Sequence, residues 1–303
     1  MSDTAKHAYL IMAHHQFDLL KMLCSLLDYP NHDLYIHIDS KTACCPFDDI
    51  KQSVKFSKIY FTDRTSVNWG GYSQINCELT LLDAAVNSGE KYSYYHLISG
   101  VDLPLKTAEE IYRFFEANSG KEFIQCDLGS PQWQESIKKR VNHYCIFQEK
   151  AGRSNKLWQK RQDKLRHWQY RLEIDRTKNI GKTLYNGANW FSITDKLARF
   201  ILQNKNWIKK HFNHTICADE VFLQALIGGT EFENALYEPF PQTGGAKACM
   251  RYIDWKRGEP YTFTEADFDE LINCECLFAR KFDISTHPEI CRKLYEHLKK
   301  TSE

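Results

Sequence analysis

Short apolar runs alternate with amphipathic segments along the first half of the chain. Two segments, residues 17–27 and 75–86, repeat their apolar positions at helical spacing. Thr107 and Glu110 form a capping-box pattern, so a further helix is expected to begin there. Runs of mostly apolar residues with the length of buried strands cover residues 8–12, 34–38, 58–61 and 94–98. The pattern therefore predicts strands and helices in alternation.

This alternation predicts an α/β fold, with a mostly parallel central sheet and helices on both faces. Ligands of such sheets bind at the carboxyl ends of the strands. His14, Asp39 and Asp102 each follow one of the predicted strands. We therefore expect these three side chains at the edge of the sheet that carries the chemistry.

The charge of the chain is balanced overall but uneven along its length. Its 303 residues suffice for one large α/β domain or two small ones, and the net charge of +1 selects neither nucleic acid nor membrane. Residues 138–182, however, hold fourteen lysines and arginines against four acidic residues, with Trp158, Trp168 and Tyr170 interleaved. Two interpretations stay open: a solvated amphipathic helix pair, or a flap that meets an anionic or glycan substrate. No nucleic-acid-binding motif accompanies the charge, so nucleic acid is not an expected partner.

Cysteine spacing and the first apolar run indicate the compartment. The chain has eleven cysteines, an odd number, and the closest pairs (Cys44 with Cys45, Cys274 with Cys276) are not C-x-x-C motifs. We expect free thiols in a reducing environment. The run at residues 8–13 is too short for a signal-peptide core or a membrane span. These features predict a cytoplasmic protein without a transmembrane segment, and peripheral association with a membrane stays open.

Metal sites are weakly indicated. A D-x-D pair after a strand could hold a divalent cation, but the turn after residues 34–38 reads Asp39-Ser40-Lys41, with a lysine in the second position. The other D-x-D, residues 267–269, is expected on a helix surface. The histidine pairs at 14–15 and 211/214 lack further ligands at suitable spacing. No bound metal is therefore expected.

Two charged pairs could carry chemistry. Arg280-Lys281 stands between aromatic residues that would anchor it, and such cations suit a phosphate group, although an Arg-Lys pair is more often plain surface. Asp219-Glu220 opens an apolar helical run. Asp219 suits an N-terminal helix cap, whereas a carboxylate at that position facing a cleft could equally be a general base. Trp69-Gly70-Gly71 indicates either a turn or a close backbone approach to a ligand.

Eight segments, taken in order, resemble the core-2/I-branching β-1,6-N-acetylglucosaminyltransferase family, which includes the peptide O-xylosyltransferases. They span most of the chain and read AYLIMAHH, LYIHIDSKT, NWGGYS, YYHLISGVDLPLKT, NGANWF, ADEVFLQAL, RYIDW and LFARKFD. Trp69-Gly70-Gly71, Asp254-Trp255 and the FARKF segment look more like the xylosyltransferase branch. The basic residues 138–182 match neither branch well.

The resemblance implies a GT-A-like fold and an inverting glycosyltransferase that moves GlcNAc or xylose from a UDP-sugar to a hydroxyl of a glycan or peptide without a metal cofactor. It further implies one domain over residues 1–303, with a nucleotide-binding half at 1–130 and an acceptor- and diphosphate-binding half at 131–303 that contains the basic insertion 138–182.

Residue roles also follow from the resemblance. Glu220 matches the catalytic base. The implied donor-binding residues are His14, Asp39, Arg280 and Lys281. The implied acceptor-binding residues are Asp102, Asn189 and Trp190, although Asn189 stands where the xylosyltransferase branch often has Asp. An inactive binding protein of the same fold is the alternative, and the joint presence of Glu220, Arg280 and Lys281 favours an enzyme.

Overall fold

The computed structural model describes residues 5–127, 131–238 and 245–302. Its centre is a six-stranded mixed sheet with the strand order β3-β2-β1-β4-β7-β6. Strands β3, β2, β1 and β4 run parallel, and β7 is antiparallel to both β4 and β6. The bounds are β1 (Lys6–Ala13), β2 (His32–Ile38), β3 (Lys58–Phe61), β4 (Tyr92–Ser99), β6 (Phe123–Ile124) and β7 (Phe191–Thr194).

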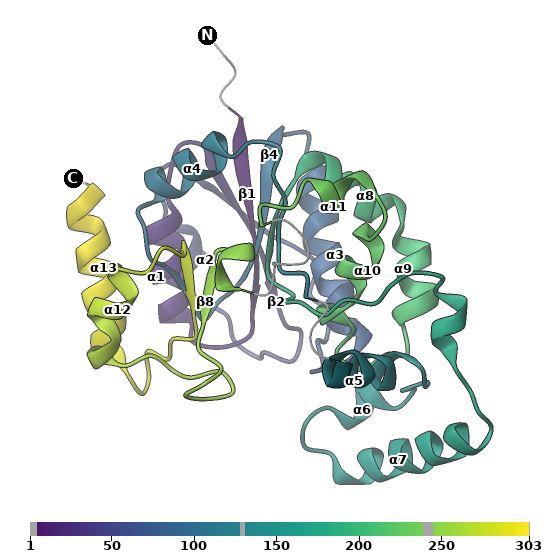
Figure 1. The fold of residues 1–303 in the computed structure, drawn as a ribbon. Helices are drawn as coiled ribbons and strands as arrows, with labels where there is room; N and C mark the ends of the chain where they lie inside the picture. The colour runs from purple at the N-terminus through teal and green to yellow at the C-terminus, as the bar shows by residue number, and fades with distance from the viewer. Residues whose placement is uncertain (1–4, 128–130, 239–244, 303) are drawn as a thin grey trace.

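Helices cover both faces of this sheet (Figure 1). Alternate side chains of β1 point to opposite faces, as the geometry of a strand requires. Leu10 packs with α3 in one apolar cluster, and Tyr9 packs with α1 and α13 in the other. Because both faces are covered, the central strands read as continuous apolar runs rather than as alternating ones. The sequence prediction of an α/β sheet covered on both faces is confirmed.

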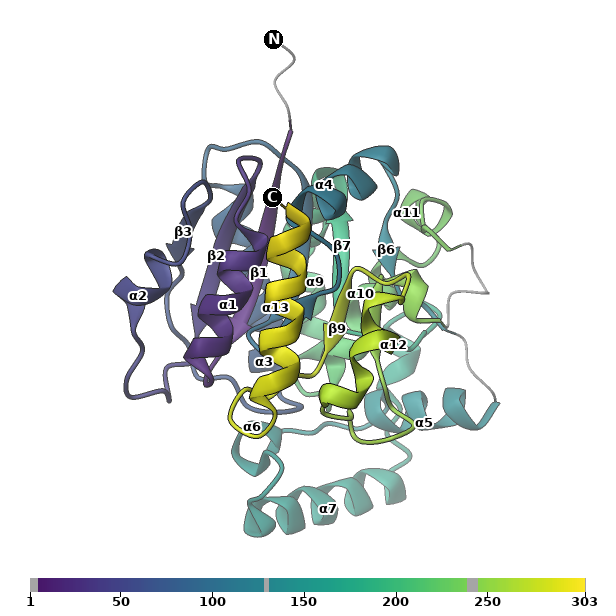
Figure 2. The same cartoon turned by 90° about the vertical axis from the view of Figure 1, so that its left-hand side faces the viewer.

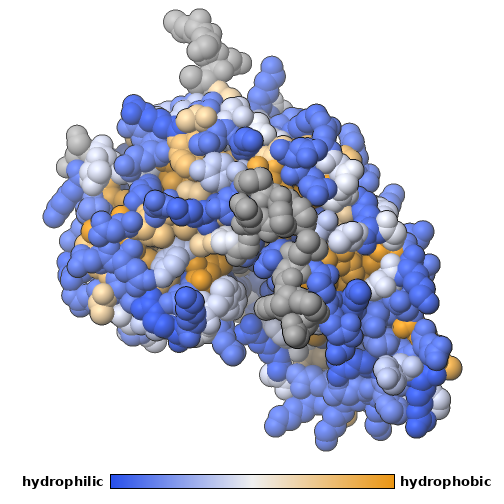
Figure 3. All heavy atoms as spheres, viewed as in Figure 1, coloured by the Kyte–Doolittle hydropathy of each residue, from blue (hydrophilic) through white to orange (hydrophobic). Residues whose placement is uncertain are grey.

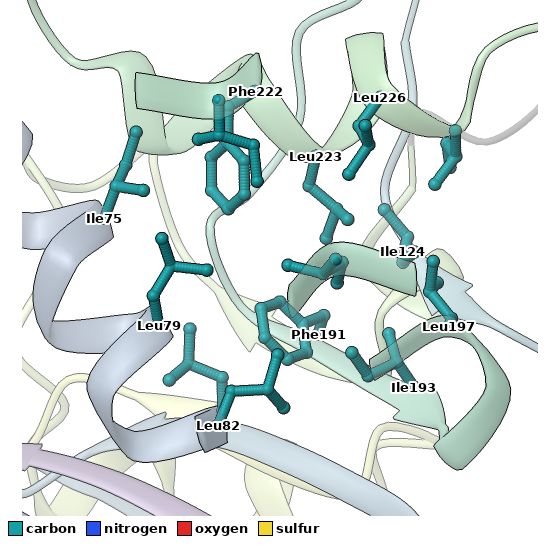
Figure 4. Packing of buried hydrophobic residues seen from close by; sticks show 14 of the residues in the cluster. Ile75, Leu79, Leu82, Ile124, Phe191, Ile193, Leu197, Phe222, Leu223 and Leu226 are labelled. Atoms are coloured by element: carbon teal, nitrogen blue, oxygen red, sulfur yellow. The ribbon is translucent and has the colours of Figure 1, made fainter. Parts of the chain in front are cut away.

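One face carries α3, α8, α9 and α10. Figure 4 shows Leu79 of α3 and Phe222 of α10 among the apolar residues that pack there. The opposite face carries α1, α4 and α13, and Figure 2 shows α1 and α13 side by side in front of the sheet. The bounds are α1 (Phe17–Leu27), α2 (Phe47–Lys51), α3 (Tyr72–Val86), α4 (Ala108–Ala117), α8 (Asp195–Gln203), α9 (Lys205–Phe212), α10 (Phe222–Ile227), α11 (Glu231–Asn234) and α13 (Pro288–Ser302).

The predicted elements match the observed ones closely. Helix α1 has the predicted bounds, and α3 begins three residues earlier than predicted, after Gly71. Thr107 caps α4 with its side chain, and Glu110 completes the capping box. The four predicted strand runs lie within β1, β2, β3 and β4. Apolar periodicity was sufficient to predict these elements, because each packs against one of the two apolar clusters that cover the faces of the sheet.

A small second sheet stands beside the first, with the order β5-β9-β8. Its members are β5 (Asp102–Pro104), β8 (Arg251–Ile253) and β9 (Phe278–Arg280). The turn η4 (Glu265–Asp267) and the helix α12 (Phe268–Ile272) follow β8. The expectation that residues 267–269 lie on a helix surface is wrong for Asp267, which is buried in a capping box with Thr264 and paired with Arg257. Asp269 is exposed as expected.

The basic stretch forms a separate group of helices below the sheet in Figure 1. It contains α5 (Pro131–Val141), α6 (Gln148–Ala151), α7 (Lys156–Arg171) and the turn η1 (Arg176–Asn179). The stretch is thus mainly helical, and α7 is exposed along most of its length. Figure 3 shows this end of the molecule as a mainly hydrophilic surface with scattered apolar side chains. None of the helices in the described part of the chain is long and apolar enough to cross a lipid bilayer.

Candidate active site

A cavity of about 780 Å³ lies at the carboxyl ends of β1, β2 and β4. All but one of the residues that the sequence singled out for catalysis or binding line this cavity, namely His14, Asp39, Asn189, Trp190, Glu220, Arg280 and Lys281. The exception is Asp102, which is buried behind the cavity wall. The strand ends therefore gather the predicted residues at one edge of the sheet.

At the end of β2, one carboxylate and one ammonium group lie together. The Asp39 carboxylate accepts hydrogen bonds from the amides of Lys41 (2.8 Å) and Val67 (3.3 Å). The Lys41 ammonium lies 3.5 Å from the same carboxylate and donates to the Asn68 side chain at 3.0 Å. A lysine thus stands where a D-x-D motif would place its second acid. Within the described residues, no cluster of three or more His, Cys, Asp or Glu side chains could hold a metal ion.

Arg280 is held rigidly at the end of β9. Its guanidinium lies 2.9 Å from Asp102, donates to the Ser99 hydroxyl, and stacks over the Trp190 ring at 4.7 Å. The Asp102 carboxylate also accepts from the Ser99 amide and hydroxyl, at 2.9 and 2.7 Å. Asp102 and Trp190 therefore orient the arginine, and Asp102 contacts it from behind rather than facing the cavity.

Lys281, the next residue, contributes a second cation to the cavity. No carboxylate in the described part of the chain lies within ion-pair distance of its ammonium group, whereas Arg280 is paired. Its backbone carbonyl accepts from the Phe263 amide at 3.1 Å, which holds the segment against the core. Two adjacent cations, one oriented and one unpaired, are suited to an anionic group such as a diphosphate.

Glu220 lines the cavity from the turn η2 (Ala218–Glu220). Its carboxylate pairs with Arg140 of α5 at 2.7 Å, and both side chains are partly exposed. The sequence did not identify Arg140, because in the chain it is one of many cations in a basic run. The pair joins the basic segment directly to the candidate base.

The prediction that Asp219 caps the following helix is wrong. Helix α10 begins after Val221 and has no side-chain cap. Asp219 is instead buried, and one of its oxygens accepts from the Gln74 amide at 3.0 Å while the other has no described partner. Burial, followed by the charge of Glu220, raises the pKa of Asp219 to about 7. The two neighbouring acids both line the cavity but differ in environment: the Glu220 side chain is partly exposed and paired with Arg140, whereas Asp219 is buried.

A third carboxyl group lies deeper, on α3. Glu78 is one helical turn beyond Gln74, on the same face of the helix, and both of its oxygens are buried without a hydrogen-bond partner. Burial and the nearby Asp219 raise the pKa of Glu78 well above its ordinary value. Glu78 was not identified from the sequence, because there it occupies an ordinary helix position.

The loop before β7 places Asn189 and Trp190 next to Glu220. The Gly187 amide donates to the Glu220 carbonyl at 3.0 Å. A Cβ at Gly187 would meet the Gln125 carbonyl at 1.9 Å, so only glycine fits there. The buried Gln224 side chain donates to the carbonyls of Gln125 and Ala188, both at 3.1 Å. These contacts fix the loop relative to η2 and α10.

Trp69-Gly70-Gly71 forms a turn against which the basic segment packs. The Glu149 carboxylate of α6 accepts from the Ser73 amide and hydroxyl, both at 2.8 Å, and a Cβ at Gly71 would come within 2.5 Å of it. The Arg153 guanidinium stacks over the Trp69 ring at 4.5 Å, and both residues line the cavity. The turn interpretation is thus correct, and the turn also brings the indole of Trp69 and the guanidinium of Arg153 to the cavity.

Comparison with known proteins identifies the family. The family model described as "Branch: Core-2/I-Branching enzyme" matches residues 7–272. A beta-1,3-galactosyl-O-glycosyl-glycoprotein beta-1,6-N-acetylglucosaminyltransferase of Bos taurus is 22% identical over 96% of this chain and 69% of its own length. Xylosyltransferase 2 of Homo sapiens is 23% identical over 96% of this chain. This chain spans only 33% of the length of that xylosyltransferase.

One solved structure aligns with this chain at low similarity. Mouse xyloside xylosyltransferase 1 in its apo form aligns with a TM-score of 0.40 and 10% identity, over 91% of this chain and 96% of that chain. The family match covers most of the chain and includes the strand ends, Glu220 and the loop with Asn189. The chain therefore belongs to the Core-2/I-branching enzyme family and is a glycosyltransferase.

Proposed function

We propose that this glycosyltransferase moves GlcNAc or xylose from a UDP-sugar to a hydroxyl of a glycan or peptide, with inversion and without a divalent metal. The observation that supports this most is that Glu220 lines the same cavity as Arg280 and Lys281, although it lies far from these two cations in the chain. An inverting transfer needs a base for the acceptor hydroxyl and positive charge for the departing diphosphate. The cavity contains both.

In the proposed reaction, Glu220 takes the proton of the acceptor hydroxyl as its oxygen attacks the anomeric carbon. The bond from the anomeric carbon to the diphosphate oxygen breaks, and Arg280 and Lys281 stabilise the negative charge that develops there. Since Asp102 and Ser99 already orient Arg280, little reorganisation is needed in the transition state. His14 and Asp39, at the ends of β1 and β2, are the proposed contacts of the uridine.

Metal independence is also part of the proposal. Its support is the ammonium of Lys41 beside Asp39, where a metal-binding member of such a fold would need a second acid. The proposed location is the cytosol, where the eleven cysteines of the chain, all free thiols here, would stay reduced.

A screen of nucleotide sugars tests this function. The thermal unfolding midpoint is measured with UDP, UDP-GlcNAc, UDP-xylose, UDP-glucose and GDP-mannose, and hydrolysis of each donor is followed by release of the nucleotide. We expect UDP and either UDP-GlcNAc or UDP-xylose to raise the midpoint, and the same donor to be hydrolysed slowly. Stabilisation by GDP-mannose alone would overturn the uridine assignment. Stabilisation by UDP without hydrolysis or transfer of any of these sugars would favour an inactive binding protein.

A further inference from the structure

Helix α7 (Lys156–Arg171) stands apart from the sheet and is strongly basic. It contains six lysines and arginines and one acidic residue, Asp163, which pairs with Arg166 of the same helix at 2.6 Å. Both cartoon views place α7 at the lower extremity of the molecule, beyond α6 (Figures 1 and 2). The function proposed above assigns no role to this helix.

Only one face of α7 is attached to the protein. Gln162 and Gln169 are its buried residues, and their amides donate to the Tyr144 carbonyl, each at 3.0 Å. The Trp158 ring packs on Phe147, with centroids 5.4 Å apart. A few polar anchors thus fix the position of α7, while no residue that the structure describes buries the opposite face.

The outward face combines cations with apolar side chains. Leu157, Lys160, Lys164, Trp168 and Arg171 recur at intervals of three and four residues, so they share one face. Leu157 is 59% exposed and Trp168 is 61% exposed, and Leu172 just beyond the helix is 67% exposed. Within the described residues, no carboxylate forms an ion pair with Lys160, Lys164 or Arg171.

From this face we infer that α7 binds the surface of an anionic lipid bilayer. A helix that lies on a membrane has a basic polar face for the headgroups and Trp or Leu side chains that reach the acyl boundary. Each lysine or arginine near an anionic bilayer contributes to the attraction. Nucleic acid is the other polyanion, but it offers no apolar layer for the leucines, so the composition of the face favours lipid.

The position of α7 determines where a bound bilayer would lie relative to the cavity. Arg153, which lines the cavity, lies three residues before the helix begins, and α6 packs directly against α7. The helix and the carboxyl ends of the strands are at the same end of the molecule (Figure 1). A bilayer bound by α7 would therefore lie near the cavity mouth. The inference concerns binding alone and does not rest on the proposed reaction.

Vesicle co-sedimentation of the full chain tests the inference. The vesicles contain phosphatidylcholine alone or with about 30% phosphatidylglycerol, at about 0.1 M salt, where charges beyond roughly 10 Å are screened. We expect binding to the anionic vesicles only. The variant Lys160→Glu/Lys164→Glu should bind at least about tenfold more weakly, since each cation contributes roughly fivefold. Trp168→Ser should also weaken binding while the protein stays folded by circular dichroism.

The matched control is Lys91→Glu/Lys121→Glu, which changes the net charge equally with two exposed lysines that precede β4 and β6. It should bind the anionic vesicles like the parent chain. Equal loss in this control would show that overall charge, and not α7, is responsible. Absence of binding to anionic vesicles would overturn the inference. In that case, binding of the parent chain to single-stranded DNA, if Lys160→Glu/Lys164→Glu abolishes it, would show that α7 binds nucleic acid instead.

Discussion

The guanidinium of Arg140 lies 2.7 Å from the carboxylate of Glu220. Arg140 belongs to α5 in the basic segment, and Glu220 belongs to the turn before α10. The ion pair therefore connects the basic segment with the proposed catalytic base. Arg140 also contacts one carboxylate oxygen of Glu220, and this contact constrains how the Glu220 side chain can face the acceptor.

We expect Arg140→Ala to lower the rate of sugar transfer about fivefold, because a partly exposed ion pair contributes roughly up to 1 kcal/mol. Affinity for UDP should not change, since Arg140 contacts the base and not the nucleotide-binding cations. Arg140→Lys should restore much of the rate by supplying a cation in the same place. Steady-state kinetics on the variants checks this, with the exposed Lys139→Ala as control. An increase in rate for Arg140→Ala would show instead that the pair restrains the enzyme.

Glu220→Gln keeps the shape of the side chain and removes the base. Transfer should fall by roughly a hundred- to ten-thousand-fold, which is the usual contribution of general-base catalysis, while UDP affinity stays nearly intact. Asp219→Asn should retain most of the activity, because the asparagine keeps the shape of the side chain and its oxygen can still accept from the Gln74 amide. Transfer assays with UDP titrations measure both. If the two phenotypes are exchanged, Asp219 is the base.

Arg280→Ala and Lys281→Ala should each weaken UDP binding and slow transfer, since one charge-assisted contact to a developing charge contributes about 2 to 4 kcal/mol. Asp102→Asn should have a smaller effect in the same direction, because it frees Arg280 without removing a cavity residue. Calorimetric titration with UDP measures these affinities. Arg292→Ala, on the exposed face of α13, is the control and should bind UDP normally. Unchanged UDP affinity in both alanine variants would place the diphosphate elsewhere.

Transfer activity should survive EDTA, because Lys41 occupies the position of the second acid in a D-x-D motif. Lys41→Ala should reduce activity and should not create a requirement for manganese. Activity after chelation, with and without added Mn²⁺, is the measurement. Loss of transfer in EDTA that manganese restores would overturn metal independence.

Glu78 should make the stability of the protein depend on pH. Burial raises the pKa of Glu78 well above its ordinary value, so its contribution to stability is fully present below about 4.5 and is lost as the pH rises. Glu78→Gln removes this titration. The free energy of unfolding of the variant, relative to the parent, should therefore improve between pH 5 and pH 8 in urea denaturation. The exposed Glu135→Gln should show no such trend, and a pH-independent difference for Glu78→Gln would contradict the assignment.

Much of the fold could be predicted because local pattern and tertiary environment agree. The runs at residues 8–12 and 94–98 became central strands buried on both faces, and Thr107 capped its helix as its spacing with Glu110 indicated. The cavity residues at the ends of β1 and β2 could be predicted for the same reason, since parallel strands present their carboxyl ends at one edge. The sequence could not show which cation of a basic run makes a specific contact, and Arg140 was missed for that reason.

The sequence by itself determined the strand–helix order, the family, and the candidate roles of Glu220, Arg280 and Lys281, because these depend on local periodicity and on short motifs. The tertiary structure decided which neighbours each charge has. It placed Asp102 behind Arg280, buried Asp219 beside Gln74, and left the outward face of α7 without a partner among residues 5–127, 131–238 and 245–302. Contacts between residues far apart in the chain follow from the packing of whole elements, and burial then sets the charge state of groups that are indistinguishable in the sequence.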